Sequence, residues 1–166
     1  WLDPEDIGSN INSYYHDASI ALSPDGEQLF IYKDKNGGDI YESFKDDNLW
    51  TPAIKLYGEV NTSSYEGHVS ISINGRTLYF VSNRPGGMGG KDIYRATLQE
   101  DDSWGQIKNM GPKFNTEFDE DAPFIHANGN LLYFSSQGHN SMGGFDIFFS
   151  TLKDGKWEKP TNVGAP

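Results

Sequence analysis

The sequence predicts an all-β fold made of β-propeller blades, and three observations lead to this prediction. Tryptophans at positions 1, 50, 104 and 157 are spaced by 49, 54 and 53 residues, so the chain repeats itself. Short runs of β-branched and aromatic residues alternate with turn signals, a pattern typical of strands. No window shows the periodicity of an amphipathic helix. Four short strands in each repeat of this length describe the blades of a propeller.

Further landmarks keep the same phase as the tryptophans. Each repeat has a turn signal, then an Asp-Ile-aromatic triplet, and an Asn followed by Ser or Thr stands just before the first strand of a repeat. The turns are Pro24-Asp25-Gly26, Asn74-Gly75 and Asn128-Gly129, the triplets are Asp39-Ile40-Tyr41, Asp92-Ile93-Tyr94 and Asp146-Ile147-Phe148, and the Asn pairs are Asn12-Ser13, Asn61-Thr62 and Asn115-Thr116.

Each repeat contains four segments that we expect to form one antiparallel sheet. In the second repeat the first two segments are joined by Asn74-Gly75, which predicts a type I′ turn with positive φ at both residues. The expected strands are 18–22, 28–32, 39–44 and 50–56, then 69–73, 77–82, 92–98 and 104–110, then 123–126, 131–135, 146–152 and 157–163.

These segments define three complete four-stranded blades over residues 14–62, 63–116 and 117–166. Residues 1–13 match the last strand of a preceding blade. Propellers typically have four to eight blades, so three blades leave two sheet faces uncovered. Either a second copy of the chain forms a homodimer that covers these faces, or the parent chain has further blades.

Composition and charge exclude several classes of function. The 166 residues include 13 basic and 24 acidic side chains, and a net charge of −11 disfavours nucleic acid or an anionic membrane surface as a partner. The sequence has no cysteine, which excludes disulfides, thiol catalysis and Cys-ligated metals. No stretch approaches the roughly 20 apolar residues of a membrane span, so direct membrane insertion is not expected.

The repeat resembles the TolB-type, WD40-like propeller repeat. The resemblance rests on the Ser-Pro-Asp-Gly turn at 23–26, on Ser-Asn-Arg-Pro-Gly-Gly at 82–87, and on Gly-Gly-Lys-Asp-Ile-Tyr at 89–94. The version is similar to that of Bacteroidota envelope proteins with an OmpA-like domain, and a propeller subunit of the type IX secretion system is similar in design. This resemblance implies a periplasmic, outer-membrane-associated protein with a protein partner in the cell envelope.

Three carboxylates occupy one position of the repeat, just ahead of each first strand. Asp17, Glu66 and Glu120 lie nine residues before the turn glycines, and His68 follows close behind Glu66. First strands line the channel of a propeller, so these side chains are candidates for a channel-rim site that binds a cation or a cationic peptide. The alternative is that each carboxylate accepts hydrogen bonds from its own loop, because recurrence in every blade indicates a structural role.

Two other sets recur in every blade, and we expect both to be structural. An Asp at the start of each third strand can bind the amides of the preceding turn. A Trp at the start of each fourth strand can bury its indole between blades. Calcium binding is the alternative role of acidic residues such as Asp25, Asp34 and Asp39. We expect no metal or other cofactor, because their spacing does not match a known calcium-binding loop. The two structural sets are Asp39, Asp92, Asp146 and Trp50, Trp104, Trp157.

The glycine-rich loops are candidates for partner contact. They place Met88 in the second blade and Met142 in the third on tight turns, where a flexible apolar side chain can adapt to a partner, and Arg84 stands beside the first of them. They lack the strand-to-helix context of a phosphate-binding loop. No nucleophile motif is present either, so no catalytic residue is assigned.

The sequence therefore favours a non-catalytic protein-interaction module. A carbohydrate-active enzyme that uses the channel-rim carboxylates and a calcium-stabilised scaffold are the alternatives.

Overall fold

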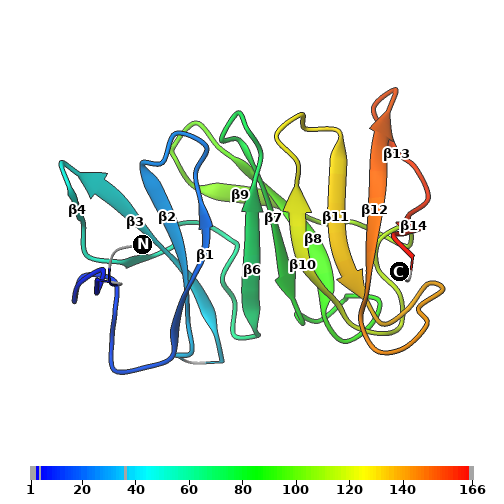
Figure 1. The fold of residues 1–166 in the computed structure, drawn as a ribbon, viewed down its shortest axis with the longest axis horizontal. Helices are drawn as coiled ribbons and strands as arrows, with labels where there is room; N and C mark the ends of the chain where they lie inside the picture. Colours follow the sequence, from blue (N-terminus) through cyan, green and yellow to red (C-terminus); the bar gives the residue numbers. More distant parts are fainter. Residues whose placement is uncertain (1–2, 4, 36, 165–166) are drawn as a thin grey trace.

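Three antiparallel sheets make up the described part of the chain (Figure 1). The computed structural model describes residues 3, 5–35 and 37–164. We call the sheets blades 1, 2 and 3. Blade 1 contains β1 (Asp17–Leu22), β2 (Gln28–Lys33), β3 (Asp39–Asp46), β4 (Leu49–Trp50) and β5 (Ile54–Lys55); blade 2 contains β6 (Glu66–Ile71), β7 (Thr77–Ser82), β8 (Asp92–Leu98) and β9 (Trp104–Asn109); blade 3 contains β10 (Glu120–Ile125), β11 (Leu131–Ser136), β12 (Asp146–Lys153), β13 (Lys156–Trp157) and β14 (Thr161–Asn162).

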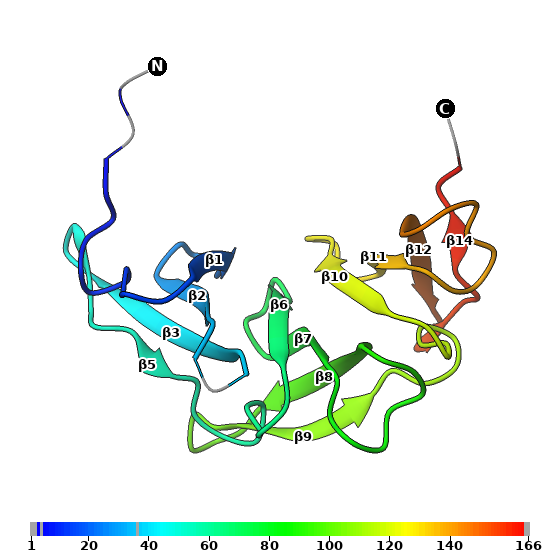
Figure 2. The same cartoon turned by 90° about the horizontal axis from the view of Figure 1, so that it is seen from below.

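The blades stand side by side along an arc (Figure 2). The first strands β1, β6 and β10 are neighbours on its inner side, and the later strands of each blade lie farther out. Within the described residues the chain forms no helix that could cross a membrane.

The outer edges of blades 1 and 3 differ from the sequence prediction. Continuous fourth strands were expected over 50–56 and 157–163, but each is split into two short pieces, β4 with β5 and β13 with β14. Pro52 and Pro160 lie in the gaps, and proline cannot donate the hydrogen bond that a ladder requires. The corresponding stretch of blade 2 contains no proline before Asn109, and β9 is one strand.

The turn at Asn74-Gly75 is also different from the prediction. Only Gly75 has a positive φ, of 68°, so the turn is not type I′. Gly75 N–H donates to Ser72 O over 2.8 Å, and the Asn74 carboxamide oxygen accepts from Ser72 Oγ and from Arg76 N–H. These side-chain bonds replace the second left-handed residue as the stabilising feature of the turn.

The N-terminal stretch forms no strand over its described residues, 3 and 5–13, so the expected outer strand of a preceding blade is not seen there. Trp1 lies outside the described residues. The stretch contacts blade 1 instead, since Asn10 accepts from Ala53 N–H and its side chain donates to Trp50 O.

Apolar side chains fill the two joins between consecutive blades. At the first join, Phe30 and Ile40 of blade 1 pack against blade 2 and are fully buried. At the second, Tyr79 and Ile93 of blade 2 pack against blade 3. The core of this molecule therefore lies between the sheets. The partners across the joins are Leu78, Phe80, Tyr94 and Trp104 in blade 2, and Ile125, Leu132, Phe134 and Phe148 in blade 3.

Candidate functional site

Glu66 and Glu120 serve as internal braces of their blades. Both are fully buried. Glu66 accepts from Thr62 N–H and Thr62 Oγ1, each over 2.7 Å, and from Ser82 Oγ over 2.8 Å. Glu120 accepts the same set from Thr116 and Ser136. Burial raises the pKa of Glu120, and these donors act against that rise.

Asp17 makes the corresponding contacts in blade 1. It accepts from Ser13 N–H and Ser13 Oγ, and Lys33 Nζ lies 3.0 Å away. Burial opposes ionisation here, but the bonds from Ser13 and the Lys33 ammonium outweigh it and lower the pKa of Asp17. Of the two roles expected for the three carboxylates, the structure favours hydrogen bonding within each blade over a shared channel-rim site.

A cationic or imidazole group stands beside each brace and binds the backbone of the linker that enters the blade. Lys33 Nζ donates to Ile11 O, Arg84 donates to Val60 O, and His139 Nε2 donates to Phe114 O over 3.0 Å. Three different residue types, from different positions of the repeat, thus fill one role.

Arg84 was expected to contact partners from its loop, and this expectation is corrected. Its side chain is 13% exposed and lies 3.4 Å from Glu66. The guanidinium also lies 5.0 Å from the ring centres of Phe80 and Tyr94. The charge of Glu66 and these rings draw the guanidinium into the blade, so it does not belong to the loop surface.

The Asp at the start of the third strand fixes the preceding loop in blades 2 and 3, as expected from the sequence, but not in blade 1. Asp92 accepts from Met88 N–H over 2.5 Å, from Gly89 N–H and from Asn109 Nδ2. Asp146 accepts from Met142 N–H and Asn162 Nδ2. Asp39 pairs with Lys55 instead, 2.8 Å away.

The acidic residues weighed for calcium are spread over blade 1. Asp25 is in the turn between β1 and β2, whereas Asp39 starts β3 at the other end of the blade. Among the described residues, no three His, Asp or Glu side chains converge as a metal site would require.

The tryptophans lie at the joins and outer edges of the blades. Trp104 is buried in the first join, and Trp157 packs edge-on against Phe114 at 5.6 Å between ring centres. Trp50 packs against the apolar cluster that Ile11 forms with Leu29 and Ile31. Gly58 runs beside Trp104 so closely that a Cβ would be 2.2 Å from Trp104 O, which requires glycine there.

A polar cluster joins blades 2 and 3 near the inner strands β6 and β10. Of its members, only His68 was a candidate site residue in the sequence analysis. His68 Nδ1 contacts Asp121, and Lys91 Nζ lies 3.3 Å from the same carboxylate and 4.7 Å from the Tyr65 ring centre. Burial opposes ionisation of Asp121, but His68 and Lys91 outweigh it and lower its pKa. Burial, with the charge of Asp121, raises the pKa of Tyr65 to about 12.

The signal for Asp121 was a break in the repeat. The matching positions of blades 1 and 2 hold Ala18 and Gly67, so the carboxylate is specific to blade 3. His68 is likewise specific to blade 2, because the matching positions of blades 1 and 3 hold Ser19 and Ala122. Two charged or polar residues that break the repeat in neighbouring first strands are a sequence signal for a contact between blades.

Three exposed apolar side chains lie in the loops and the linker at the end of blades 2 and 3 where second strands finish and third strands begin. We call Met88, Phe118 and Met142 the loop rim; they are 44%, 50% and 64% exposed. The lower edge of Figure 1 shows the loops that carry them. Because Asp92 and Asp146 fix the two Met loops, this apolar surface is held in place.

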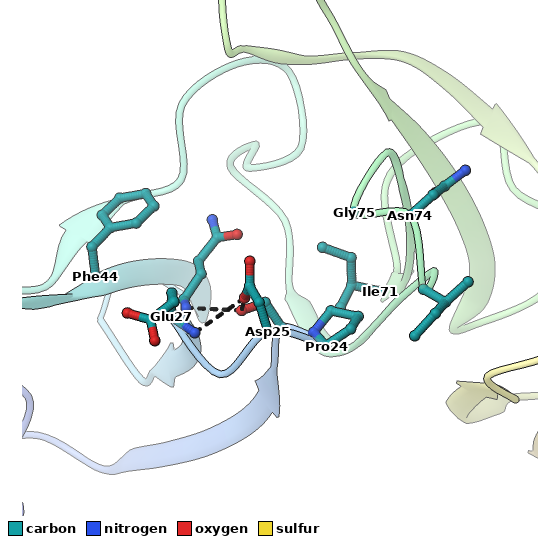
Figure 3. A pocket seen from close by; sticks show the side chains of 10 residues that line it. Pro24, Asp25, Glu27, Phe44, Ile71, Asn74 and Gly75 are labelled. Atoms are coloured by element: carbon teal, nitrogen blue, oxygen red, sulfur yellow. Dashed lines mark hydrogen bonds between the residues drawn. The ribbon is translucent and has the colours of Figure 1, made fainter.

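A groove of about 340 Å³ lies between blades 1 and 2 at the opposite end (Figure 3). The turn at Pro24 and Asp25 faces the turn at Asn74, with Ile71 between them. Hydrogen bonds from Ser23 and Glu27 lower the pKa of Asp25, so this carboxylate is ionised and engaged within its own turn. The groove offers a mixed polar and apolar surface and no arrangement of a base beside a nucleophile among its lining residues.

Comparisons with known proteins decide the fold. No family model and no curated protein matches this sequence. Among solved structures, the chain is similar to one named as a TolB from Agrobacterium tumefaciens, with a TM-score of 0.60, 19% identity, and coverage of 92% of this chain and 50% of that one. The fold is that of a β-propeller.

Two further structures agree with this fold. A hypothetical selenium-binding protein from Sulfolobus tokodaii gives a TM-score of 0.53 at 12% identity, over 89% of this chain and 42% of that one. An ancestral GH74 enzyme gives 0.52 at 19% identity, over 86% and 20%. At these identities the similarity shows the propeller fold alone. The chain spans half the length of the TolB structure and less of the other two.

Proposed function

We propose that this chain is a non-catalytic protein-interaction module of a periplasmic, outer-membrane-associated protein, and that it offers the loop rim to another protein of the cell envelope. The exposure of Met88, Phe118 and Met142 on fixed loops carries the proposal. Thioether and aromatic groups adapt to partner surfaces, and loops already ordered lose little entropy on docking.

The location in the envelope, and a place in a secretion system, rest on the resemblance of the repeat at 82–94 to propeller repeats of envelope proteins. The similarity to the TolB structure supports the same kind of scaffold.

The absence of catalysis is part of the proposal. A glycosidase acid must reach the glycosidic oxygen, and its partner must reach the sugar ring or a water molecule. Glu66 and Glu120 are fully buried and bound to Thr, Ser and backbone donors, so they are poorly placed for either task. Hydrolysis of a glycan by the wild-type chain, lost in Glu120→Gln with the fold intact, would instead support an enzyme.

The rim is tested by cross-linking the chain to proteins of an envelope extract and identifying the cross-linked peptides. We expect cross-links around the loop rim, and at least a tenfold loss of capture in the double variant Met88→Glu, Met142→Glu. The double variant Leu49→Glu, Ile54→Glu is the matched control with the same added charge, because Leu49 and Ile54 are 74% and 54% exposed on the outer strands β4 and β5 of blade 1. Equal loss in both variants, or cross-links confined to other surfaces, would contradict the proposal.

A further inference from the structure

Each blade has a trailing face, toward the next blade, and a leading face, toward the previous one. One Ile marks the trailing face in all three: Ile40 and Ile93 are fully buried, whereas Ile147 of blade 3 is 58% exposed. The leading face shows the reverse order. Ile71 and Ile125 are buried, whereas the matching Leu22 of blade 1 is 51% exposed. Two complete joins lie within the arc. At its two ends, the trailing face of blade 3 and the leading face of blade 1 are the two halves of a third join, and both are exposed.

The exposed trailing face of blade 3 is also aromatic. Tyr133 lies 6.5 Å from Phe124 and 5.9 Å from Phe149 between ring centres. Tyr133 is the counterpart of Tyr79, which is 7% exposed in the second join. A surface of this kind in a repeat protein requires a cover.

The two complete joins share one pattern of hydrogen bonds. Asn61 clamps Ile40, accepting from its N–H and donating to its carbonyl, both over 2.8 Å. Asn115 clamps Ile93 in the same way, over 2.8 and 2.9 Å. A backbone bond accompanies each clamp, from Glu66 N–H to Gly38 O and from Glu120 N–H to Lys91 O.

This chain carries both halves of a third such set. Asn12 is the counterpart of Asn61 and Asn115, and it is exposed ahead of blade 1, where its side chain donates to Asp6. Ile147, the residue that a clamp would bind, lies at the other end of the arc. The backbone groups that would pair are Asp17 N–H and Phe145 O, again at opposite ends.

The glycine loops give independent support. In blade 2, a Cβ at Gly89 would be 2.3 Å from Phe118 O, because the loop touches the linker to blade 3. At the matching Gly143 of blade 3, no described residue beyond the two chain neighbours lies within 4 Å of the Cβ position. A glycine at 143 thus leaves room for a linker to pack against this loop, as the linker at Phe118 packs against Gly89. The linker at the matching position of the repeat, ahead of blade 1, holds Tyr15.

We propose that the trailing face of blade 3 binds the leading face of blade 1 in a second copy of this chain. Figure 2 shows that the arc is open on one side, with blades 1 and 3 bordering the opening. A two-fold axis along the channel would make two identical joins and a closed ring of six blades, within the usual range for propellers. Each join would contain Ile147 clamped by Asn12, with Leu22 covered by Phe124 and Tyr133.

Charge sets the conditions for this assembly. Each copy carries a net charge of −11, so two copies repel one another at low ionic strength. Salt screens this repulsion over about 10 Å at 0.1 M. The dimer should therefore become tighter as salt is added.

The test is the mass of the 166-residue chain in solution, measured by sedimentation over a range of concentrations and salt. We expect a species of two chains of 18.5 kDa each. Ile147→Asp should weaken it at least tenfold at each join, because a carboxylate would be buried without a partner. Leu49→Asp is the matched control, with the same added charge at a 74% exposed residue of the outermost strand β4, and should leave the dimer unchanged.

Mixing two variants tests the head-to-tail arrangement. Ile147→Asp and Leu22→Asp each damage one half of every join in their own dimers. A mixed dimer has one doubly altered join and one intact join. Because the intact join alone can hold two chains together, the mixture should associate more tightly than either variant, whose joins are both damaged. A chain that stays monomeric at all concentrations, a dimer insensitive to Ile147→Asp, or a mixture no tighter than its components would overturn the proposal. Circular dichroism of each variant verifies that the strands are intact.

Discussion

Blades 2 and 3 carry the same repeat but differ in how much of it is covered. Blade 2 has a neighbour on both faces, so Ile93 is fully buried and the Gly89 loop touches the next linker. Blade 3 has a neighbour on one face, so Ile147 is exposed, and among the described residues none beyond the chain neighbours comes within 4 Å of a Cβ at Gly143. The repeat sets the strands and turns of each blade, whereas the neighbouring blade decides which of its residues form a core.

The braces of the two blades add a second contrast. The role of Arg84 in blade 2 is taken by His139 in blade 3, one position later after the second strand and with a φ of 53°. A permanent charge beside a buried carboxylate is thus replaced by an imidazole that packs edge-on against Phe134 and at a tilt against Phe148. Equivalent backbone carbonyls of the linkers can thus be bound by different side chains in different blades, provided that a donor of each side chain reaches the carbonyl oxygen.

The largest expected difference is between Ile93→Ala and Ile147→Ala. The first removes a fully buried side chain from a join and should lower the free energy of unfolding by about 4 kcal/mol. The second removes an exposed side chain and should change it by less than about 0.5 kcal/mol in dilute solution. Urea unfolding of both variants measures the difference. Equal losses would mean that both faces are covered within one chain.

Arg84→Met should be the next largest change, at about 3 kcal/mol, because it leaves Glu66 buried without its cation. His139→Gln removes one hydrogen bond to Phe114 O and should cost about 1 kcal/mol. Thermal unfolding at neutral pH compares them. If His139→Gln proved the more damaging, the imidazole would be the stronger brace and the contrast between the blades would be reversed.

Gly89→Ala and Gly143→Ala separate the two Met loops. A methyl group at Gly89 meets backbone oxygens of the linker, and the resulting shift should cost about 2 kcal/mol. At Gly143 the space is open, and alanine should be neutral or stabilising by up to about 1 kcal/mol. Denaturant midpoints check both values, and a loss at Gly143 in dilute solution would show that its loop is already packed.

The smallest expected effect concerns pH, where neighbouring carboxyls act in opposite directions. Burial raises the pKa of Glu120, so its contribution to stability is present below the ordinary value of 4.5 and is lost as the pH rises through the folded-state pKa. The pKa of Asp121 is lowered, so its contribution is present above 3.8 and is lost as the pH falls.

Unfolding measured between pH 3 and 7 resolves these two contributions. Glu120→Gln should remove the loss on the alkaline side, and Asp121→Asn should remove the loss on the acid side. If the free energy of unfolding of the two variants depended on pH in the same way, the conclusion that His68 and Lys91 lower the pKa of Asp121 would be contradicted.

Much of the fold could be predicted from the sequence because its landmarks are local. The Asp-Ile-aromatic triplets and the turn glycines recur in phase, and this was enough for three sheets of antiparallel strands. The interrupted outer strands follow from Pro52 and Pro160, because neither proline can donate a hydrogen bond to the ladder. The turn at Asn74 depended on a side-chain bond to Ser72 that the dipeptide alone does not reveal.

The candidate sites were harder to predict because they depend on contacts between blades. Nothing near Arg84 in the sequence indicates that its guanidinium reaches Val60 O in the preceding linker, 24 positions away. The pairing of His68 with Asp121 likewise joins neighbouring inner strands of different blades. Recurrence did identify Glu66 and Glu120 correctly as a matched set, but only their burial separated a brace from a binding site.

Hydrogen exchange at the backbone amides of Ile40, Ile93 and Ile147 tests most directly the claim that neighbouring blades complete one another. Asn61 and Asn115 bind the first two amides, so these should exchange slowly at every chain concentration. The Ile147 amide should exchange quickly in dilute solution and become protected as the concentration or the salt is raised, when Asn12 of a second copy binds it. Equal protection of all three amides in the dilute chain, or rapid exchange at Ile93, would contradict the account.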